Sequence, residues 1–102
     1  MHAVIDEKKQ ELTKLCRNYR VRRLALFGSA TRKDFAPSRS DLDFLVEFRD
    51  LASGEYADTY FGLLEGLEAL FDRRVDLVMA SAVENPYLIQ EIQQSEIELY
   101  AA

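Results

Sequence analysis

Hydrophobic residues recur along this chain with two different periods, and these periods predict where helices and strands lie. Over residues 4–19 the apolar positions return every three or four residues, with Lys and Glu between them, as in an amphipathic helix. The apolar stripe consists of Ile5, Leu12, Leu15, Cys16 and Tyr19. We expect this helix to pack on a core, with Cys16 as a small buried residue rather than a reactive thiol.

Shorter apolar runs predict strands. Residues 21–27 end in Leu24-Ala25-Leu26-Phe27, which is apolar on both faces and suits a central strand covered on both sides. Over residues 41–48 polarity alternates, so one face should be buried and carry Leu42, Phe44, Val46 and Phe48. The opposite face then carries Asp41, Asp43, Leu45 and Glu47. A third strand is expected over 74–79 and a short edge strand over 97–100.

Two more helices are predicted after the second strand. One covers 58–71, follows a polar connection over 49–58, has Asp58 or Thr59 as its N-cap, and should bury Tyr60, Phe61, Leu64, Leu67 and Phe71. The other begins at Asn85-Pro86, an N-cap followed by proline, and should bury Leu88, Ile89 and Ile92. This order of elements predicts an α/β sandwich, a small sheet with helices packed on it, as one domain over residues 1–102.

Composition limits the chemistry. The chain has 13 basic and 18 acidic residues, a formal charge of -5 and a pI near 4.8. Gripping a nucleic-acid backbone requires basic residues, so we expect no direct nucleic-acid contact. A single cysteine and a single histidine exclude an internal disulfide and a cysteine-based zinc site. Any metal should therefore be a hard cation bound by oxygen.

The first residues lack the apolar segment of a signal peptide, and no stretch is long enough to cross a membrane. We therefore expect a cytoplasmic location and no membrane partner.

Gly28-Ser29 is the first feature that suggests chemistry, because it follows directly on the first strand. Glycine lets a phosphate approach the backbone, and the free N–H groups at the start of a following helix attract anions. Taken alone, the dipeptide is equally typical of a tight turn with a serine cap. Arg32 nearby is either a phosphate contact or a solvated loop residue.

Carboxylates are the second feature. Asp41 and Asp43 share one strand face, from which their side chains can converge on two divalent cations about 3.5–4 Å apart. Asp76 interrupts a strand that should be interior, where a carboxylate is costly to bury unless it is paired or metal-bound. Ordinary surface carboxylates, or an ion pair of Asp76 with Arg22, Arg23, Arg73 or Arg74, are the alternatives. Three carboxylates beside a glycine turn favour a metal site.

Together these residues resemble a known family. Phe27-Gly28-Ser29, an eleven-residue spacer, Asp41-Leu42-Asp43 and the later Asp76 resemble the DNA polymerase β-type nucleotidyltransferase superfamily. The run from Gly28 to Arg32, Ser40 before the aspartates, and the ending Asn85-Pro86-Tyr87-Leu88 … Leu99-Tyr100 are similar to minimal nucleotidyltransferases. These include antitoxins of the MntA type, encoded beside a toxin with a HEPN domain.

The resemblance implies a nucleotidyltransferase fold with a small mixed sheet, and it implies a role for each motif residue. The nucleotide, expected to be ATP, would be bound by Gly28, Ser29, Arg32 and Ser40. Two Mg²⁺ ions, replaceable by Mn²⁺, would be bound by Asp41, Asp43 and Asp76. The same three aspartates would be the catalytic residues, with Asp76 helping to activate the attacking hydroxyl.

The resulting interpretation is a magnesium-dependent nucleotidyltransferase that moves AMP from ATP to a hydroxyl of a partner protein. The expected partner is a HEPN-domain toxin modified on a tyrosine, with this chain as its antitoxin. Two alternatives remain open: an antitoxin that acts by binding alone, and the nucleotide-binding subunit of a two-chain enzyme for small molecules. The sequence leaves open the nucleotide, the number of transfers and the formation of homo- or hetero-oligomers.

Overall fold

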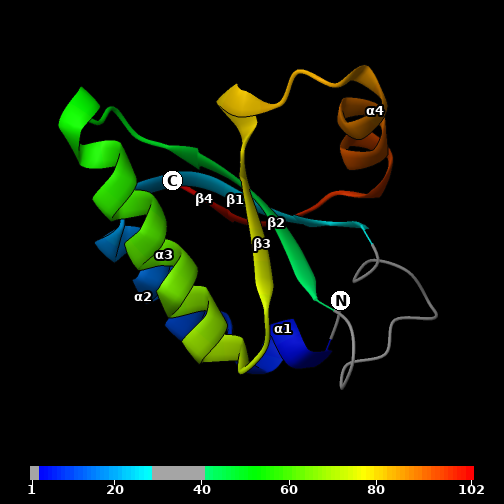
Figure 1. Ribbon diagram of the computed structural model, residues 1–102. Coiled ribbons are helices and arrows are strands. Elements are labelled where there is room, and N and C mark those ends of the chain that lie inside the picture. The colour runs from blue at the N-terminus through cyan, green and yellow to red at the C-terminus, as the bar shows by residue number, and fades with distance from the viewer. Residues whose placement is uncertain (1–2, 29–40) are drawn as a thin grey trace.

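The computed structural model describes residues 3–28 and 41–102, and its elements follow the predicted order (Figure 1). The helices are α1 (Ala3–Glu7), α2 (Lys9–Asn18), α3 (Tyr56–Phe71) and α4 (Pro86–Ser95). The single helix predicted over residues 4–19 is therefore wrong in one respect, because Lys8, whose ψ of 12° is not helical, separates α1 from α2. The strands are β1 (Val21–Phe27), β2 (Leu42–Phe48), β3 (Val75–Met79) and β4 (Ile97–Ala101), and two short 3₁₀ turns are η2 (Ser53–Glu55) and η3 (Ala80–Ala82). Across these two described ranges, no helix combines the length and the apolar character needed to span a membrane.

The four strands form one mixed sheet in the order β3-β2-β1-β4. β1 pairs antiparallel with β2 on one side and with β4 on the other, whereas β2 and β3 run parallel. The predicted central position of the first strand is confirmed, because residues 24–27 are all buried. The predicted edge strand near the C-terminus is confirmed as β4, and with it the α/β arrangement.

Helices cover the two faces of the sheet to different extents. α2 and α3 pack side by side on one face, and α4 lies on the other (Figure 1). The main core lies under α2 and α3 and includes Ile5, Leu12, Cys16, Leu24, Leu26, Leu42, Phe44, Val46, Leu63 and Leu67. A smaller core under α4 is formed by Ala25, Phe27, Leu45 and Ile92. Alternate residues of β1 and β2 therefore belong to different cores, as the period of two predicted.

α3 starts earlier than predicted. It begins at Tyr56, so the predicted N-cap, Asp58 or Thr59, is wrong: both residues lie inside the first turn. The turn before the helix is closed by Glu55, whose carboxylate accepts a hydrogen bond from the Ala52 N–H at 2.9 Å. The hydrogen bond between Ala52 and Glu55 in η2 therefore stands where the sequence predicted a side-chain cap of the helix.

The predicted buried face of α3 is confirmed for Leu67 and Phe71, and Tyr60 and Leu64 pack against the main core, but two residues differ from the prediction. Leu63, Leu67 and Phe71 are buried, whereas Phe61 is 56% exposed and contacts Tyr60 edge-on. At 100° per residue, Phe61 lies 200° from Leu63 and thus on the opposite side of the helix. The prediction that Phe61 faces the core is wrong.

α4 begins as predicted. Asn85 Oδ1 accepts a hydrogen bond from the Tyr87 N–H at 2.9 Å, and proline follows the cap, so this N-cap is confirmed. Ile92 is buried and Leu88 packs against the smaller core. Ile89 is 37% exposed, which contradicts its predicted inward position. Residues 88 and 92 are four apart and face the sheet, whereas residue 89 lies a quarter turn away.

β3 lies at an edge of the sheet, and α3 covers part of that edge. The Tyr60 hydroxyl donates a hydrogen bond to the Leu77 carbonyl at 2.5 Å. The Glu68 carboxylate accepts one from the Val75 N–H at 3.2 Å. Side-chain bonds of this kind leave fewer backbone groups with which another chain could pair.

Cys16 provides a test of the main core. Its side chain is fully buried, and burial raises the pKa of its thiol to about 12. Because the thiolate is the reactive form, we expect the reagent DTNB to leave Cys16 unmodified in the native protein and to modify it after unfolding in guanidinium chloride. Rapid stoichiometric reaction in native buffer would contradict the buried position.

Candidate active site

Parallel pairing of β2 and β3 sets two carboxylates side by side. The register pairs Asp43 with Asp76, and two residues later Leu45 with Val78. Residues paired in this way point to the same face of the sheet, and neighbouring strands lie about 4.8 Å apart. Leu45 and Val78 belong to the smaller core under α4. Asp43 and Asp76 therefore project from the α4 side of the sheet, just beyond the end of that core.

Asp76 reaches this position from an edge strand rather than from the predicted interior strand. Its side chain is exposed, so the expected cost of burying it does not arise. The alternative of an ordinary ion pair is also absent: no described Lys or Arg forms an ion pair with Asp41, Asp43 or Asp76. Arg23, one of the expected partners, instead pairs with Glu47, Glu96 and Glu98.

Within this cluster, the pKa of the Asp43 carboxyl is shifted from its ordinary value. Burial raises the pKa of its carboxyl to about 6, and the charge of Asp76 and a hydrogen bond with Asp76 add to the effect. The charges of Asp41 and Glu91 raise this pKa further. Several carboxylates therefore act on one half-buried group, which favours binding of either a proton or a cation at Asp43.

Asp41 lies just outside the strand. β2 begins at Leu42, one residue later than predicted, and the Asp41 side chain is exposed. Within residues 3–28 and 41–102, no three His, Cys, Asp or Glu side chains lie close enough together to ligate one ion as they stand. The fold thus brings Asp43 and Asp76 together and leaves Asp41 beside them in solvent. The predicted residues Ser29, Arg32 and Ser40 lie outside the described residues.

Gly28 connects the end of β1 to the acidic pair. Its φ of +74° lies in the left-handed region, which glycine adopts without steric cost. A Cβ placed on Gly28 would lie 2.6 Å from Asp43 Oδ2, so the backbone and the carboxylate are in direct contact. Glycine is favoured here because other residues are strained at this φ and because their Cβ would force the Asp43 carboxylate to shift.

Two residues of α4 that the sequence reasoning missed also belong to this region. Ser95 Oγ accepts a hydrogen bond from the Gly28 N–H at 3.1 Å. Glu91, one turn earlier, is near enough to Asp43 for its charge to raise the pKa of Asp43. The helical spacing of the sequence could have indicated both residues, because positions 91 and 95 lie on the same helix face as the inward positions 88 and 92.

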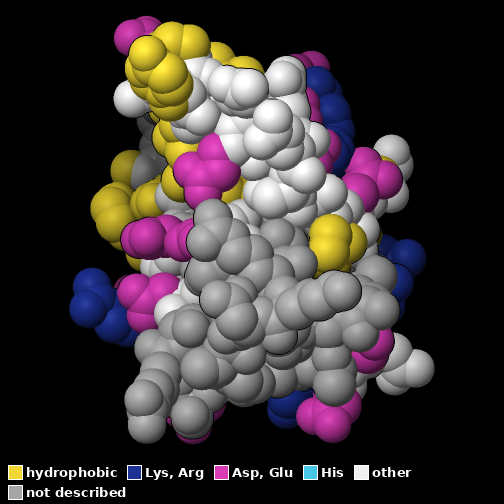
Figure 2. Space-filling view, turned by 90° about the vertical axis from the view of Figure 1, so that its right-hand side faces the viewer, with side chains coloured by type: hydrophobic (Ala, Val, Ile, Leu, Met, Phe, Trp, Pro, Cys, Tyr) yellow, Lys and Arg dark blue, Asp and Glu magenta, His cyan; other side chains and the backbone are white. Residues whose placement is uncertain are grey.

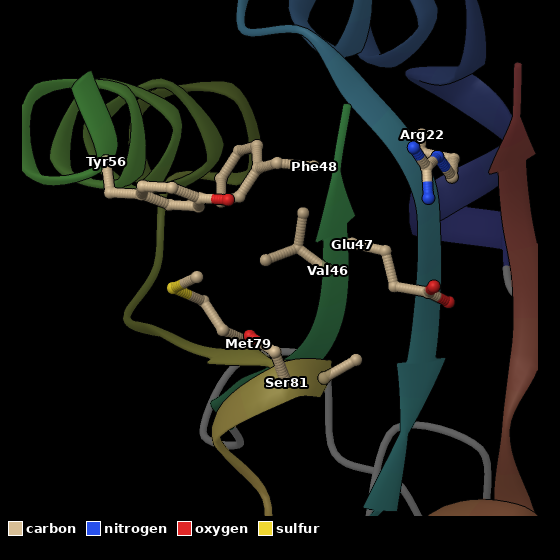
Figure 3. A pocket seen from close by; sticks show the side chains of 8 residues that line it. Arg22, Val46, Glu47, Phe48, Tyr56, Met79 and Ser81 are labelled. Atoms are coloured by element: carbon tan, nitrogen blue, oxygen red, sulfur yellow. The ribbon is translucent and has the colours of Figure 1, made fainter. Parts of the chain in front are cut away.

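A separate cavity of about 370 Å³ lies at the other end of the parallel strands (Figure 3). Its walls include Phe48 at the end of β2, Met79 at the end of β3 and Tyr56 at the start of α3. Met79 is three residues beyond Asp76, which is about 10 Å along a strand. The acidic pair is therefore not part of this cavity.

The surface on the α4 side carries many acidic side chains. In Figure 2, which faces this side, acidic side chains spread over the described part of the surface, whereas Lys and Arg appear mainly near its margins. This distribution agrees with the formal charge of -5. An anionic ligand at this face would need a compensating cation.

A model of the nucleotidyltransferase domain family matches residues 8–99. The chain belongs to this family. The match spans the glycine turn and all three aspartates, so the resemblance inferred from those residues is confirmed, and with it the prediction of a nucleotidyltransferase enzyme.

Two relatives of this nucleotidyltransferase are similar over most of their length. A putative protein adenylyltransferase of Methanocaldococcus jannaschii is 36% identical over 97 residues, which cover 91% of this chain and 95% of the relative. Protein adenylyltransferase MntA of Thermococcus cleftensis is 35% identical over 85 residues, which cover 83% of this chain and 79% of the relative.

Solved structures share the fold. A putative minimal nucleotidyltransferase is 28% identical with a TM-score of 0.72, over 91% of this chain and 90% of that chain. A chain from the complex of a tri-AMPylated Shewanella oneidensis HEPN toxin with its MNT antitoxin is 22% identical with a TM-score of 0.65. That match covers 95% of this chain and 72% of the other. The predicted nucleotidyltransferase fold is confirmed.

The contact between Gly28 and Asp43 can be tested by adding a methyl group. We expect Gly28→Ala to lower the free energy of unfolding by about 1–3 kcal/mol, because a left-handed backbone is unfavourable for alanine and its Cβ would collide with Asp43. Gly54→Ala is the matched control, since no atom lies within 4 Å of its added Cβ. Urea denaturation compares the two variants. Equal stabilities would argue against the contact.

The raised pKa of Asp43 predicts a pH-dependent stability. Its folded-state pKa of about 6 exceeds the ordinary value of 3.8, so the folded protein binds this proton more tightly than the unfolded chain. The stabilising contribution is therefore full below about pH 4 and is lost as the pH rises through about 6. In metal-free buffer near pH 7, we expect Asp43→Asn to be more stable than the parent by on the order of 1 kcal/mol, a value discounted for solvent screening.

Unfolding in EDTA near pH 4 and near pH 7 measures this difference. The advantage of Asp43→Asn should shrink toward zero at the lower pH, where the parent carboxyl is already protonated. Glu84→Gln, which removes one exposed charge before α4, is the control and should show no such trend. An equal gain at both pH values would contradict the shifted pKa.

Proposed function

We propose that this protein transfers AMP from magnesium-bound ATP to a hydroxyl group of a partner protein and releases pyrophosphate. The observation that carries the proposal is the placement of Asp43 beside Asp76 and in contact with Gly28, in a chain of the nucleotidyltransferase family. Carboxylates at a glycine turn suit the cleavage of a metal-bound triphosphate.

The charge of the site makes a cation part of the proposal. An acidic face would repel a triphosphate unless cations reversed the local sign. The donors present are carboxylate oxygens, which Mg²⁺ prefers, and Asp43, Asp76 and Asp41 would hold the ions. When bound, magnesium ions lower the pKa of the attacking hydroxyl and stabilise the charge on the leaving oxygen.

Residues of the chain would position the reacting groups. Gly28 has no side chain, so the Asp43 carboxylate lies against the turn, and a phosphate held by a cation on Asp43 would lie beside the turn. Asp76 is exposed on the edge strand, so an acceptor hydroxyl can reach it from solvent and pass its proton to a carboxylate. The hydroxyl oxygen then forms a bond to the α-phosphorus as the bond between that phosphorus and the bridging oxygen breaks, and pyrophosphate leaves.

The relatives support a protein as the acceptor. One relative is named protein adenylyltransferase MntA, and one structural neighbour comes from a complex with a tri-AMPylated HEPN toxin. We infer that the acceptor here is a hydroxyl, most simply that of a tyrosine, on a HEPN-type toxin, and that this chain is its antitoxin. The acidic α4 face argues against a nucleic-acid acceptor. Tyr87, which is 82% exposed on α4, and the connection over 49–55 that precedes α3 are candidate partner contacts.

Intact mass of the HEPN-type partner, measured after incubation with this protein, ATP and Mg²⁺, tests the proposal. We expect a gain of one or more adenylyl units that EDTA abolishes. Asp43→Asn and Asp76→Asn should each slow the transfer by at least about 100-fold, because both carboxylates act at the reacting phosphate. Glu84→Gln should retain the parent rate.

A toxin that is inhibited without any mass gain would contradict the transfer and favour an antitoxin that acts by binding alone. An adenylyl gain that survives Asp43→Asn and Asp76→Asn would contradict the roles assigned to these residues.

A further inference from the structure

We propose that Ser95 is a positioning residue that holds Gly28 against Asp43 and thereby sets the affinity for the nucleotide. This inference rests on the proposed role of the glycine turn in binding nucleotide phosphates. Ser95 itself would touch neither the nucleotide nor the metal, and it would act through the backbone of Gly28.

The two hydrogen bonds of Ser95 define how its hydroxyl is oriented. A hydroxyl has one proton to donate and two lone pairs that accept. Ser95 Oγ lies 2.8 Å from the Glu91 carbonyl, to which it donates its proton, and 3.1 Å from the Gly28 nitrogen, whose N–H it accepts. Since its proton is committed within the helix, the hydroxyl presents only an acceptor to Gly28.

α4 is a fixed support for this hydroxyl. Three residues before Ser95, Ile92 is 4% exposed in the smaller core with Ala25, Phe27 and Leu45. Directly after Ser95, Glu96 forms an ion pair with Arg23 of β1, which also pairs with Glu98 at 2.7 Å. The helix is therefore anchored to the sheet on both sides of Ser95, and the hydroxyl keeps its place relative to β1.

Gly28 is held between two groups. On one side its N–H is bonded to Ser95, and on the other its Cα faces Asp43 Oδ2. Without the Ser95 hydroxyl, the turn has one fewer restraint and can move away from the carboxylate. A nucleotide has to contact the turn and the carboxylate-bound cation at the same time, so a looser turn weakens binding even when the fold is intact.

Two variants and a matched control test this role. Ser95→Ala removes the hydroxyl, Ser95→Thr keeps it, and Gln94→Ala alters the exposed neighbouring residue of the same helix end. The chain has only 4 glycines, so a protein labelled with ¹⁵N-glycine gives a simple amide spectrum in which Gly28 can be followed. We expect its signal to shift and to exchange faster with solvent in Ser95→Ala, and to stay close to the parent signal in the other two variants.

Calorimetric titration with the ATP analogue AMP-PNP and Mg²⁺ then measures the functional effect. We expect Ser95→Ala to bind about fivefold to tenfold more weakly than the parent, as for the loss of one hydrogen bond. Ser95→Thr and Gln94→Ala should bind as the parent does. Thermal unfolding of the same variants serves as a control for stability. A variant that is merely less stable would have a lower melting temperature but would bind AMP-PNP as the parent does at temperatures where it is folded.

The outcomes distinguish this inference from the proposed function. If the parent binds AMP-PNP and Ser95→Ala binds it equally well, the positioning role is overturned and the proposed function stands. Weaker binding with an unmoved Gly28 signal would also overturn the role, because the effect would not pass through Gly28. If the parent does not bind AMP-PNP, the proposed function fails, and the role of Ser95 in nucleotide affinity fails with it.

Discussion

The parallel pairing of β2 with β3 is the interaction on which the candidate site depends. Its register sets Asp43 opposite Asp76, and the same register places Leu42, Phe44 and Val46 in the main core together with Val75 and Leu77. A shift of one residue would move Asp76 to the other face of the sheet and its apolar neighbours out of the core. The core therefore enforces the juxtaposition of two like charges that repel each other.

This arrangement of carboxylates lowers the stability of the metal-free protein. Asp43 is half-buried among carboxylates, and its pKa is raised to about 6. Sites built for binding or catalysis are commonly less favourable for stability than a neutral substitute would be. Here the same repulsion that destabilises the metal-free state would be relieved when cations bind. Under the proposed function, local instability and cation binding would thus be two consequences of one charge cluster.

The two faces and the β3 edge of the sheet have different roles in burying apolar surface and in exposing the acidic pair. α2 and α3 bury most of the apolar surface, and α3 also occupies backbone groups at the β3 edge through Tyr60 and Glu68. The other face has only a small core under α4, which leaves the acidic pair next to solvent. The Asp76 side chain is consequently accessible to an incoming group, even though side chains of α3 form hydrogen bonds with backbone groups of the neighbouring residues Val75 and Leu77.

The sequence alone determined the elements whose pattern is local. The periods of two and of three to four located the four described strands and the helical regions, because side-chain alternation and helix stripes follow from backbone geometry. They did not locate the break at Lys8 that divides the first predicted helix into α1 and α2. The Asn85-Pro86 cap and the unreactive environment of Cys16 could be predicted in the same way. The motif from Phe27 to Asp43 together with Asp76 was sufficient to indicate the nucleotidyltransferase family.

Only the tertiary structure decided which strand lies at an edge and which residues meet across elements. Asp76 is exposed rather than interior, because strand order is not encoded in the polarity of a single strand. Phe61 faces solvent although it is apolar, because the face of α3 is chosen by its fit to α2 and the sheet. Ser95 meets Gly28 across 67 positions of sequence, a contact that no local pattern specifies and that exists because α4 packs back over β1.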